Sequence, residues 1–409
     1  MILRLQILCT AVLALLASSD ARAAFPFDWG LTGEISAEVR SFPREELFPE
    51  QESATASPSI HIELELLAEW NDGLDRVTFV PYARWDAHDD HRSHLDVREL
   101  HWIHQEESWS FLAGVGKVFW GVTESRHLVD IINQVDQVED IDEEDKLGQP
   151  MLNVTLLGDW GAIDLFLLPY FRERTFPDED ARLRGLFKVS GDADYSSDLE
   201  EWHPDWALRW SQTLGEFDLG LSFFRGTSRE PVFLPRFGSS PNDITLRPRY
   251  EVIDQIGFDG QWTHEAWLWK FEGIVRHGHA DTFGAFVAGF EYTLFQIGGT
   301  DGDLGLLVEY LYDGRPRDPI EAPITRAEHD VFAGFRWAAN NVSDTQLLGG
   351  AIVDTRSGET FAILEAAHRL GDSWLFQVEV RWLFEVERDS IAASVRRDSF
   401  VSARLTWHF

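Results

Sequence analysis

Cysteine, lysine and long apolar runs are all scarce in this sequence of 409 residues. Cys9 is the only cysteine, so no disulfide can form within the chain. Nearly all of the basic charge is arginine, because lysine occurs only as Lys117, Lys146, Lys188 and Lys270. After the first 23 residues no run reaches the length of about 18 apolar residues that a transmembrane helix needs. The sequence therefore excludes both a disulfide scaffold and a helical membrane protein.

Residues 1–23 have the layout of a secretory signal peptide. Arg4 stands near the front, an apolar run follows from Leu5 to Ala17, and Ala21-Arg22-Ala23 forms a small-x-small cleavage site. Cys9 lies inside this segment. We therefore expect an exported mature chain of residues 24–409 that contains no cysteine.

Acidic residues outnumber basic residues by two to one, with 70 Asp and Glu against 35 Lys and Arg and a formal net charge of -35. This balance argues against nucleic acid as a partner. Solvated loops explain the acidity most simply. Two more specific interpretations are a cation-favouring vestibule and acidic loops that divalent cations bridge at a lipopolysaccharide surface.

Apolar and polar residues alternate with a period of two along most of the mature chain, which predicts β-strands. Short turns, such as residues 71–75 and 157–161, alternate with long polar connections near 41–58, 121–149, 172–202, 226–249 and 313–329. This layout is typical of a bacterial outer-membrane β-barrel with short periplasmic turns and long extracellular loops. We predict an all-β antiparallel barrel of about 18 strands from near Trp29 to Phe409, or 16 if weak strands at 76–86 and 345–353 fail.

The last strand carries apolar residues at every second position up to the final residue, with Leu405, Trp407 and Phe409 on one face. This pattern resembles the C-terminal signal that the bacterial barrel-assembly machinery reads. A soluble β-sandwich would explain the alternation but not the terminal Phe409.

A barrel of 16 to 18 strands is wide enough for an aqueous lumen. The connection at 121–149 contains its own apolar residues among many acids, and a long loop of this kind must bury them somewhere. Two interpretations stay open: the loop folds into the lumen and narrows the pore, or it caps the barrel from outside. The candidates for pore lining and constriction are Lys117, Asp130, Asp136, Glu139, Asp140, Glu379, Arg381 and Arg404.

Around this loop the chain reads LAGVGKVFWGVTES, then VDIINQVD and QPML, then AIDLFLLPYF. In these stretches it resembles a family of porin-like outer-membrane proteins of uncharacterised function from Gram-negative bacteria. The family carries a basic residue and a Trp-Gly pair before the loop, where this chain has Lys117, Trp120 and Gly121. It usually has Asn-Pro where this chain has Asn133-Gln134. The resemblance implies a passive channel and names no substrate.

One cluster has metal-ligand chemistry, the stretch HDDHRSH with His88, His91 and His94. It is expected at the tip of an outer loop, where a solvated polar turn is the simpler interpretation. No nucleophile with a paired base is recognisable, so we expect no enzyme activity, no cofactor and no metal. Strands that begin near Trp29 leave no room for the plug domain of an active transporter.

The sequence therefore predicts a passive outer-membrane channel for small solutes, with a preference for cations. The alternative is a barrel with a blocked lumen and a surface role as an adhesin, enzyme or structural protein. The expected partners are outer-membrane lipid and lipopolysaccharide, the barrel-assembly machinery and small solutes. Both a homotrimer and a monomer stay open.

Overall fold

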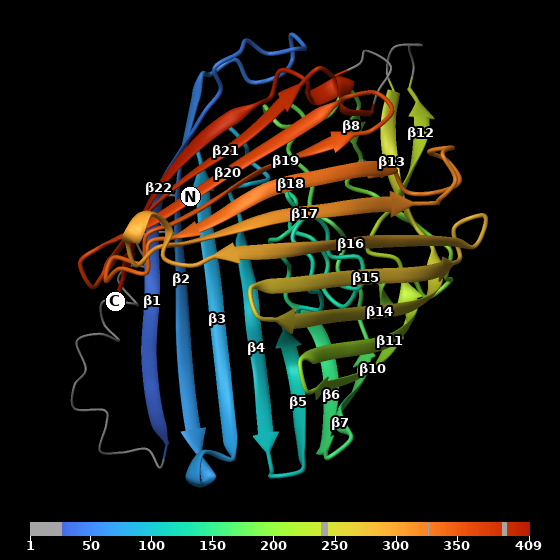
Figure 1. Cartoon of the computed structure of the whole chain (residues 1–409). Helices are drawn as coiled ribbons and strands as arrows, with labels where there is room; N and C mark the ends of the chain where they lie inside the picture. The colour runs from blue at the N-terminus through green and yellow to red at the C-terminus, as the bar shows by residue number, and fades with distance from the viewer. Residues whose placement is uncertain (1–26, 239–243, 326, 387–390) are drawn as a thin grey trace.

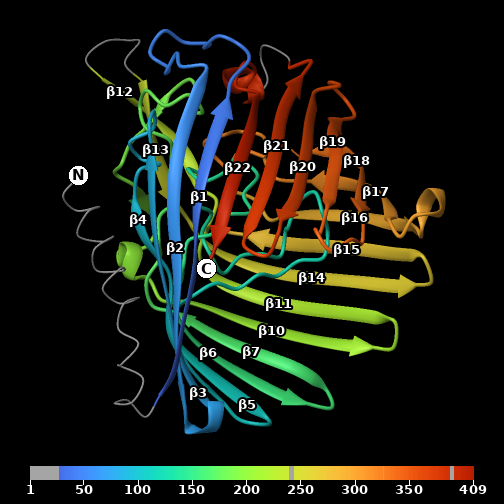
Figure 2. The ribbon, with the colours of Figure 1, turned by 90° about the vertical axis from the view of Figure 1, so that its left-hand side faces the viewer.

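The computed structural model describes residues 27–238, 244–325, 327–386 and 391–409. Eighteen strands form one antiparallel sheet, and β1 (Asp28–Ser41) pairs with β22 (Phe400–His408), which closes the sheet into a barrel (Figures 1 and 2). The predicted 18-strand antiparallel barrel is therefore confirmed. The predicted signal peptide, residues 1–23 with Cys9, lies outside the described residues.

The other barrel strands follow the chain order around the ring. They are β2 (Ala56–Trp70), β3 (Asp75–Asp86), β4 (Leu95–Gln105), β5 (Trp109–Gly116), β6 (Gln149–Gly158), β7 (Gly161–Leu168), β10 (Asp205–Leu214), β11 (Phe217–Thr227), β14 (Val252–His264), β15 (Trp267–His277), β16 (Phe283–Leu294), β17 (Asp303–Asp313), β18 (His329–Ala338), β19 (Gln346–Asp354), β20 (Thr360–Leu370) and β21 (Trp374–Phe384). The two strands that the sequence predicts weakly are β3 and β19. Because both form, the 16-strand alternative is wrong.

The two faces of each strand are inverted relative to a soluble protein. In β1, Ile35 is 37% and Val39 42% exposed, whereas Ser36 and Glu38 on the other face are 0% and 2% exposed. Exposed apolar side chains thus cover the outside of the barrel, and many of the side chains buried inside it are polar. This inversion is the one expected of a barrel surrounded by lipid, where only a closed sheet satisfies every backbone group.

The seam between the first and last strands closes at the final residue. The backbone N–H and carbonyl of Phe409 both bond to Gly33, with N···O distances of 3.0 Å each. Leu405 and Trp407 lie on the outer face of β22. Leu405 and Trp407 therefore belong to the strand that completes the ring, and Phe409 directly follows it. Their recognition by the assembly machinery stays a prediction.

The connections differ in length between the two ends of the barrel. At one end the links are short turns such as residues 159–160 and 215–216, and at the other they include residues 42–55, 117–148, 169–204, 228–251, 314–328 and 385–399. Two of these long links form a second sheet beside the barrel from β8 (Lys188–Val189), β9 (Asp194–Tyr195), β12 (Val232–Phe237) and β13 (Ile244–Tyr250). Figure 1 shows β12 and β13 at this end of the molecule.

Among the described residues, helical structure is limited to short 3-10 turns, which are η2 (Asn71–Gly73), η3 (Glu200–Trp202), η4 (Ile297–Gly299) and η5 (Ile391–Val395). In the part of the chain that the structure describes, none of these has the length and apolarity of a membrane-crossing helix.

Candidate functional site

Residues 117–148, here called the interior segment, join β5 to β6 and lie against inward-facing side chains of strands all around the ring. Buried apolar residues at its start pack on the inner wall of the barrel. This cluster contains Trp120, Leu128, Val129, Ile131 and Ile132 of the segment together with wall residues that include Met151, Phe166, Phe224, Ile274, Leu307 and Phe332. The inner wall from β6 to β18 therefore carries an apolar core, and the segment supplies its other half.

One buried carboxylate, that of Glu272 on β15, fixes the start of the interior segment. Glu272 accepts hydrogen bonds from the backbone N–H groups of Val122 at 2.7 Å and Thr123 at 3.0 Å, and from the Thr123 hydroxyl at 2.7 Å. The N–H of Val129 also donates to it, at 3.3 Å. These backbone groups lie outside any strand and have no ladder partner, so a buried charged acceptor satisfies donors that would otherwise destabilise the fold.

A second carboxylate, that of Glu309 on β17, holds the next two residues of the segment. It accepts the N–H groups of Glu124 and Ser125, each at 2.8 Å, and the Ser125 hydroxyl at 2.5 Å. Both anchoring carboxylates point into the barrel and are almost completely buried. The segment is thus tied to the inner wall at β15 and β17 through backbone N–H groups and through the hydroxyls of Thr123 and Ser125.

The second half of the interior segment is tied to a distant part of the wall by ion pairs. Asp136 lies 2.6 Å from a guanidinium nitrogen of Arg98 on β4, and Glu139 lies 2.8 Å from one of Arg84 on β3. The Tyr82 hydroxyl donates to Glu139 at 2.9 Å. In the strand order, β3 and β17 are roughly half of the ring apart. The segment therefore crosses the barrel interior from wall to wall.

A β-bulge in β4 positions Arg98 for its ion pair with Asp136. The register between β3 and β4 shifts at Val80 and Pro81, which leaves Arg98 opposite no residue. A bulge of this kind turns a side chain away from its regular alternation. Here it lets Arg98 reach the interior, where Asp136 is fully buried beneath it.

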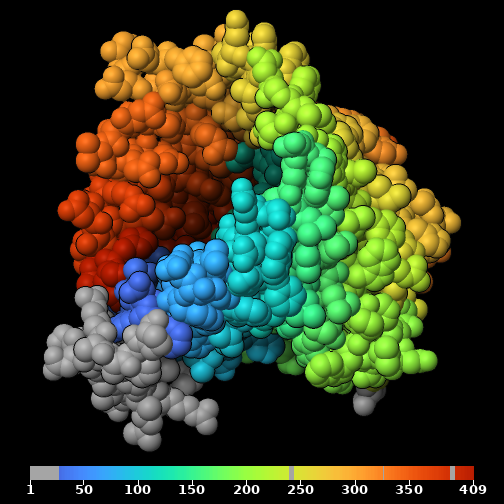
Figure 3. Space-filling model, turned by 90° about the horizontal axis from the view of Figure 1, so that it is seen from below, coloured from blue at the N-terminus to red at the C-terminus, as the bar shows by residue number. Residues whose placement is uncertain are grey.

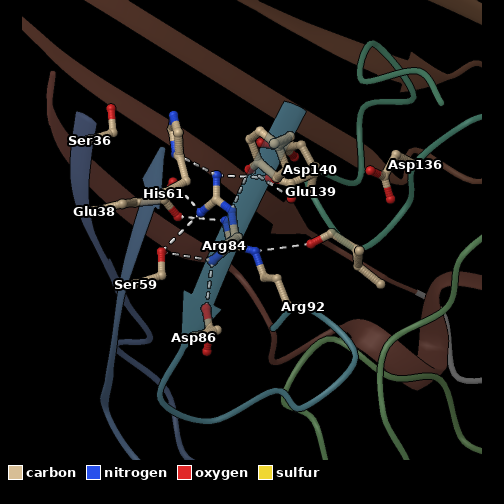
Figure 4. Close-up of polar contacts among 12 residues, drawn as sticks. Ser36, Glu38, Ser59, His61, Arg84, Asp86, Arg92, Asp136, Glu139 and Asp140 are labelled. Atoms are coloured by element: carbon tan, nitrogen blue, oxygen red, sulfur yellow. Dashed lines mark hydrogen bonds and ion pairs between the residues drawn. The ribbon is translucent and has the colours of Figure 1, made fainter. Parts of the chain in front are cut away.

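The wall under Glu139 is a dense network of charges (Figure 4). Glu38 on β1 lies 3.0 Å from Arg40, 2.9 Å from Arg92 and 2.9 Å from Arg404. Arg92 also pairs with Asp86 at 2.7 Å. Each arginine has an acidic partner, so the wall is neutralised rather than presented to the lumen as positive charge. Removing one member of a buried pair of this kind costs about 3–5 kcal/mol, because the other charge is left without compensation.

A third wall contact lies on β21. A guanidinium nitrogen of Arg381 lies 2.7 Å from Asp142, and another lies 3.7 Å from Asp140. The third points at Glu365 on β20, at 2.9 Å. Arg381 therefore connects the acidic part of the interior segment to the strands that complete the ring.

The acidic tip of the segment, residues 142–145, remains partly in contact with water. The side chains of Glu143 and Glu144 are 53% and 54% exposed, and that of Glu365 is 40% exposed. Figure 3 shows a hollow that opens between the orange-to-red strands and the blue-to-cyan strands of the barrel. The tip thus exposes carboxylates to solvent, while Arg381 nearby is buried.

Several groups of the tip have shifted pKa values. Burial raises the pKa of Asp142 to about 7 and that of Asp145 to about 6, and neighbouring carboxylates, including Asp140, add to both shifts. Burial opposes the charge of His127, but its contacts with Glu144 and Glu272 outweigh this and raise its pKa to about 10. The tip therefore changes charge near neutral pH, whereas His127 stays an imidazolium.

The residues that the sequence proposes for the pore have different surroundings in the structure. Asp136, Glu139, Asp140, Arg381 and Arg404 come together in the ion-pair network described above. Asp130 pairs instead with Lys146 of the same segment at 3.1 Å, Lys117 is exposed, and Glu379 accepts a hydrogen bond from Ser402 at 3.2 Å.

The sequence alone does not single out Glu309, Arg84 and Arg98 as anchors. Glu309 and Arg84 are recognisable as inward by alternation. Arg98 becomes inward only through the bulge.

The histidine-rich stretch does not fit a metal. His94 with Asp136 and Glu139 would offer three ligand atoms within 4.8 Å of one another. Arg98 and Arg84 already hold both carboxylates, and a cation would have to displace these guanidiniums. His88 lies 3.2 Å from Glu52, and His91 lies 3.6 Å from Asp178.

Comparison with known proteins gives only distant similarity. No protein-family model matches the chain. No curated protein matches it either. Among solved structures, a triple mutant of the Rhodopseudomonas blastica porin is 11% identical with a TM-score of 0.43, and a structure described as "Asymmetric conductivity of engineered proteins" is 11% identical with a TM-score of 0.44. Each alignment covers 93% of this chain and 100% of the other. Similarity at this level carries no functional information, so the function has to follow from the residues of this chain.

Proposed function

We propose that this protein is a passive channel for small solutes in the bacterial outer membrane, with the interior segment as its constriction and a preference for cations. The observation that carries the proposal is the path of this segment, which is anchored at β15 and β17 on one side and at β3, β4 and β21 on the other. An interior segment that is fixed at both walls reduces the cross-section of the lumen through which a solute can pass. Charged side chains beside such an opening set ion preference.

The preference for cations follows from which charges stay accessible. Glu143, Glu144 and Glu365 are half exposed, whereas Arg84, Arg98 and Arg381 are buried in ion pairs. An entering ion therefore meets more negative than positive charge. The small solutes that fit this surface best are inorganic cations and small cationic or neutral organic molecules.

The same proposal includes the partners of the protein in the outer membrane and its oligomeric state. The apolar outer face would contact outer-membrane lipid, the acidic outer connections would meet lipopolysaccharide, and β22 would be read by the barrel-assembly machinery. The protein would act as a monomer or a homotrimer. We propose no enzymatic activity and no cofactor.

Reversal potential in a planar bilayer tests the preference. The refolded protein should give stepwise conductance, with a reversal potential biased toward cations across a KCl gradient. Glu143→Gln with Glu144→Gln should reduce this bias, because two accessible charges are lost. Glu107→Gln is the control, since Glu107 is exposed in the short turn between β4 and β5, and the whole length of β5 separates it from the segment. If the double variant and the control show the same cation bias in reversal potential, Glu143 and Glu144 do not set the ion preference.

A second function is favoured by the same anchoring. A segment held at both walls, with an apolar core under it, could also block the lumen and leave the barrel with a role at the cell surface. A folded barrel that gives no conductance in any variant would support this alternative over the channel.

A further inference from the structure

Three arginines converge on one glutamate at the long-connection end of β15 and β17. Glu230, which follows β11, lies 3.2 Å from Arg315 and 3.6 Å from Arg126, and it also pairs with Arg276 of β15. The three guanidiniums come from three different parts of the chain: the inner wall, the connection after β17 and the interior segment. Among the described residues, Glu230 is the one carboxylate that all three guanidiniums contact.

The cluster has more positive than negative charge in a chain of net charge -35. Asp313 is its other acid, 2.8 Å from Arg315 and 3.0 Å from Arg126. No second carboxylate among the described residues pairs with Arg276, whose Nε donates to the neutral amide oxygen of Gln255 at 2.8 Å. Without Glu230 the remaining groups would be three arginines and one aspartate.

The guanidiniums are held in place independently of Glu230. Arg276 and Arg315 are buried, and their guanidinium carbons lie 5.8 Å and 5.2 Å from the centre of the Phe283 ring. A cation above an aromatic face is stabilised by the ring electrons. The site is thus preorganised, and a charged fork of this kind suits the oxygens of a carboxylate or phosphate.

Glu230 and Arg126 are the more accessible members of the cluster. Its side chain is 20% exposed and that of Arg126 is 22% exposed, against 4% for Arg276 and 2% for Arg315. Burial opposes its charge, but the guanidiniums outweigh this and keep the pKa of Glu230 well below its usual range. An ionised carboxylate therefore covers the buried guanidiniums from the solvent side.

One further group near the cluster lacks a partner. His279, between β15 and β16, is 1% exposed, and neither ring nitrogen forms a hydrogen bond with any described residue. Burial, with the positive charge of Arg276, lowers its pKa to about 4, so the ring is neutral and carries one N–H donor. Buried donors without a partner are rare in folded proteins. A donor close enough to Arg276 and Arg315 to be affected by their charge favours an acceptor ligand.

We propose that Arg126, Arg276 and Arg315 form a binding site for a small oxyanion, and that Glu230 is a tethered carboxylate which occupies this site until a free anion displaces it. This inference does not depend on the channel function. A tethered group competes at a high effective concentration, so a free anion binds the unmodified protein only weakly.

Equilibrium dialysis of the refolded protein with inorganic phosphate tests the site. Glu230→Gln keeps the shape of the side chain and removes the competing charge, so we expect phosphate affinity about tenfold or more above that of the unmodified protein. Glu230→Asp, which keeps the charge on a shorter side chain, should bind with intermediate affinity. Adding Arg276→Gln to Glu230→Gln should abolish the gain.

Glu328→Gln is the matched control, because Glu328 also contacts two arginines, Arg317 at 2.5 Å and Arg356 at 3.4 Å, but on the exposed surface. It should leave phosphate binding unchanged. Repeating the titration with acetate tells a general oxyanion site from one that prefers phosphate. Folded Glu230→Gln and Glu230→Asp proteins that bind phosphate no better than the unmodified protein would overturn the proposal.

Discussion

Replacement of residues 128–145 by a short glycine-serine linker is expected to raise single-channel conductance by about twofold or more, because the part of the interior segment that crosses the barrel is removed while the strands stay. The excised part includes the contacts of Asp136, Glu139 and Asp142 with the wall. The anchors at Glu272 and Glu309 hold mainly residues 122–125, which the variant keeps.

The same linker in place of residues 190–193 serves as the control. These residues lie between β8 and β9 in the second sheet, so the lumen is not changed. Conductance of this control should equal that of the unmodified protein. If the excision variant folds, as judged by heat-modifiable mobility, and conducts no better, then the segment does not limit the pore.

Cation preference is expected to increase as the pH rises from 5 to 8. The pKa of Asp142 is raised to about 7 and that of Asp145 to about 6, by burial and then by neighbouring carboxylates. Both groups are mostly neutral at pH 5 and mostly ionised at pH 8. The tip therefore gains negative charge over this range, and reversal potentials measured at intervals across it should move toward the cation value.

A rise in pH changes the stability contributions of Asp142, in the tip, and of Glu139, in the anchor, in opposite directions. A raised pKa of Asp142 in the folded state stabilises the fold below the unfolded pKa of about 4, and this contribution is lost as the pH rises through about 7. Burial opposes the charge of Glu139, but Arg84, Arg92 and Arg98 lower its pKa to about 2. That contribution is present at neutral pH and is lost only as the pH falls toward about 2. The anchor thus persists from pH 5 to 8.

Asp142→Asn with Asp145→Asn should flatten the pH dependence of the reversal potential, since neither side chain then titrates. Asp198→Asn, in the outer connection between β7 and β10, is the control and should preserve it. An unchanged pH profile in the double variant would show that other groups set the preference.

The architecture of the barrel is readable from the sequence because lipid and water impose opposite requirements on neighbouring residues. Ile35 and Val39 face outward while Ser36 and Glu38 face inward, and this alternation recurs strand after strand. The predicted beginning at Trp29 and end at Phe409 fall within one residue of β1 and β22. The second sheet is not predicted, because β8 and β9 are too short to show a period.

The details of the site are less accessible from sequence because they depend on contacts between distant residues. Nothing in the run of acids from Asp136 to Asp145 shows that the first members are buried under arginines while Glu143 and Glu144 stay exposed. That division follows from the bulge at Arg98 and from the path of the segment. Both are properties of the closed ring rather than of a local pattern.

The central claim, that the interior segment lies against the inner wall, is tested most directly by a disulfide between Val129 and Gly257 of β14. A Cβ atom added to Gly257 would lie 3.6 Å from the Cβ of Val129, within the range of about 3.5–4.5 Å that a disulfide requires. The Ser222 hydroxyl, 2.6 Å from the added atom, would have to rotate away. The native chain has no competing cysteine other than Cys9, in the predicted signal peptide.

Oxidation of refolded Val129→Cys with Gly257→Cys should consume both thiols. Val129→Cys with Phe258→Cys should keep both, because Phe258 is the next residue and points to the outside of the barrel. Rapid cross-linking of the first pair alone is the result that contact of the interior segment with the inner wall predicts. Two free thiols in the folded first variant would contradict it.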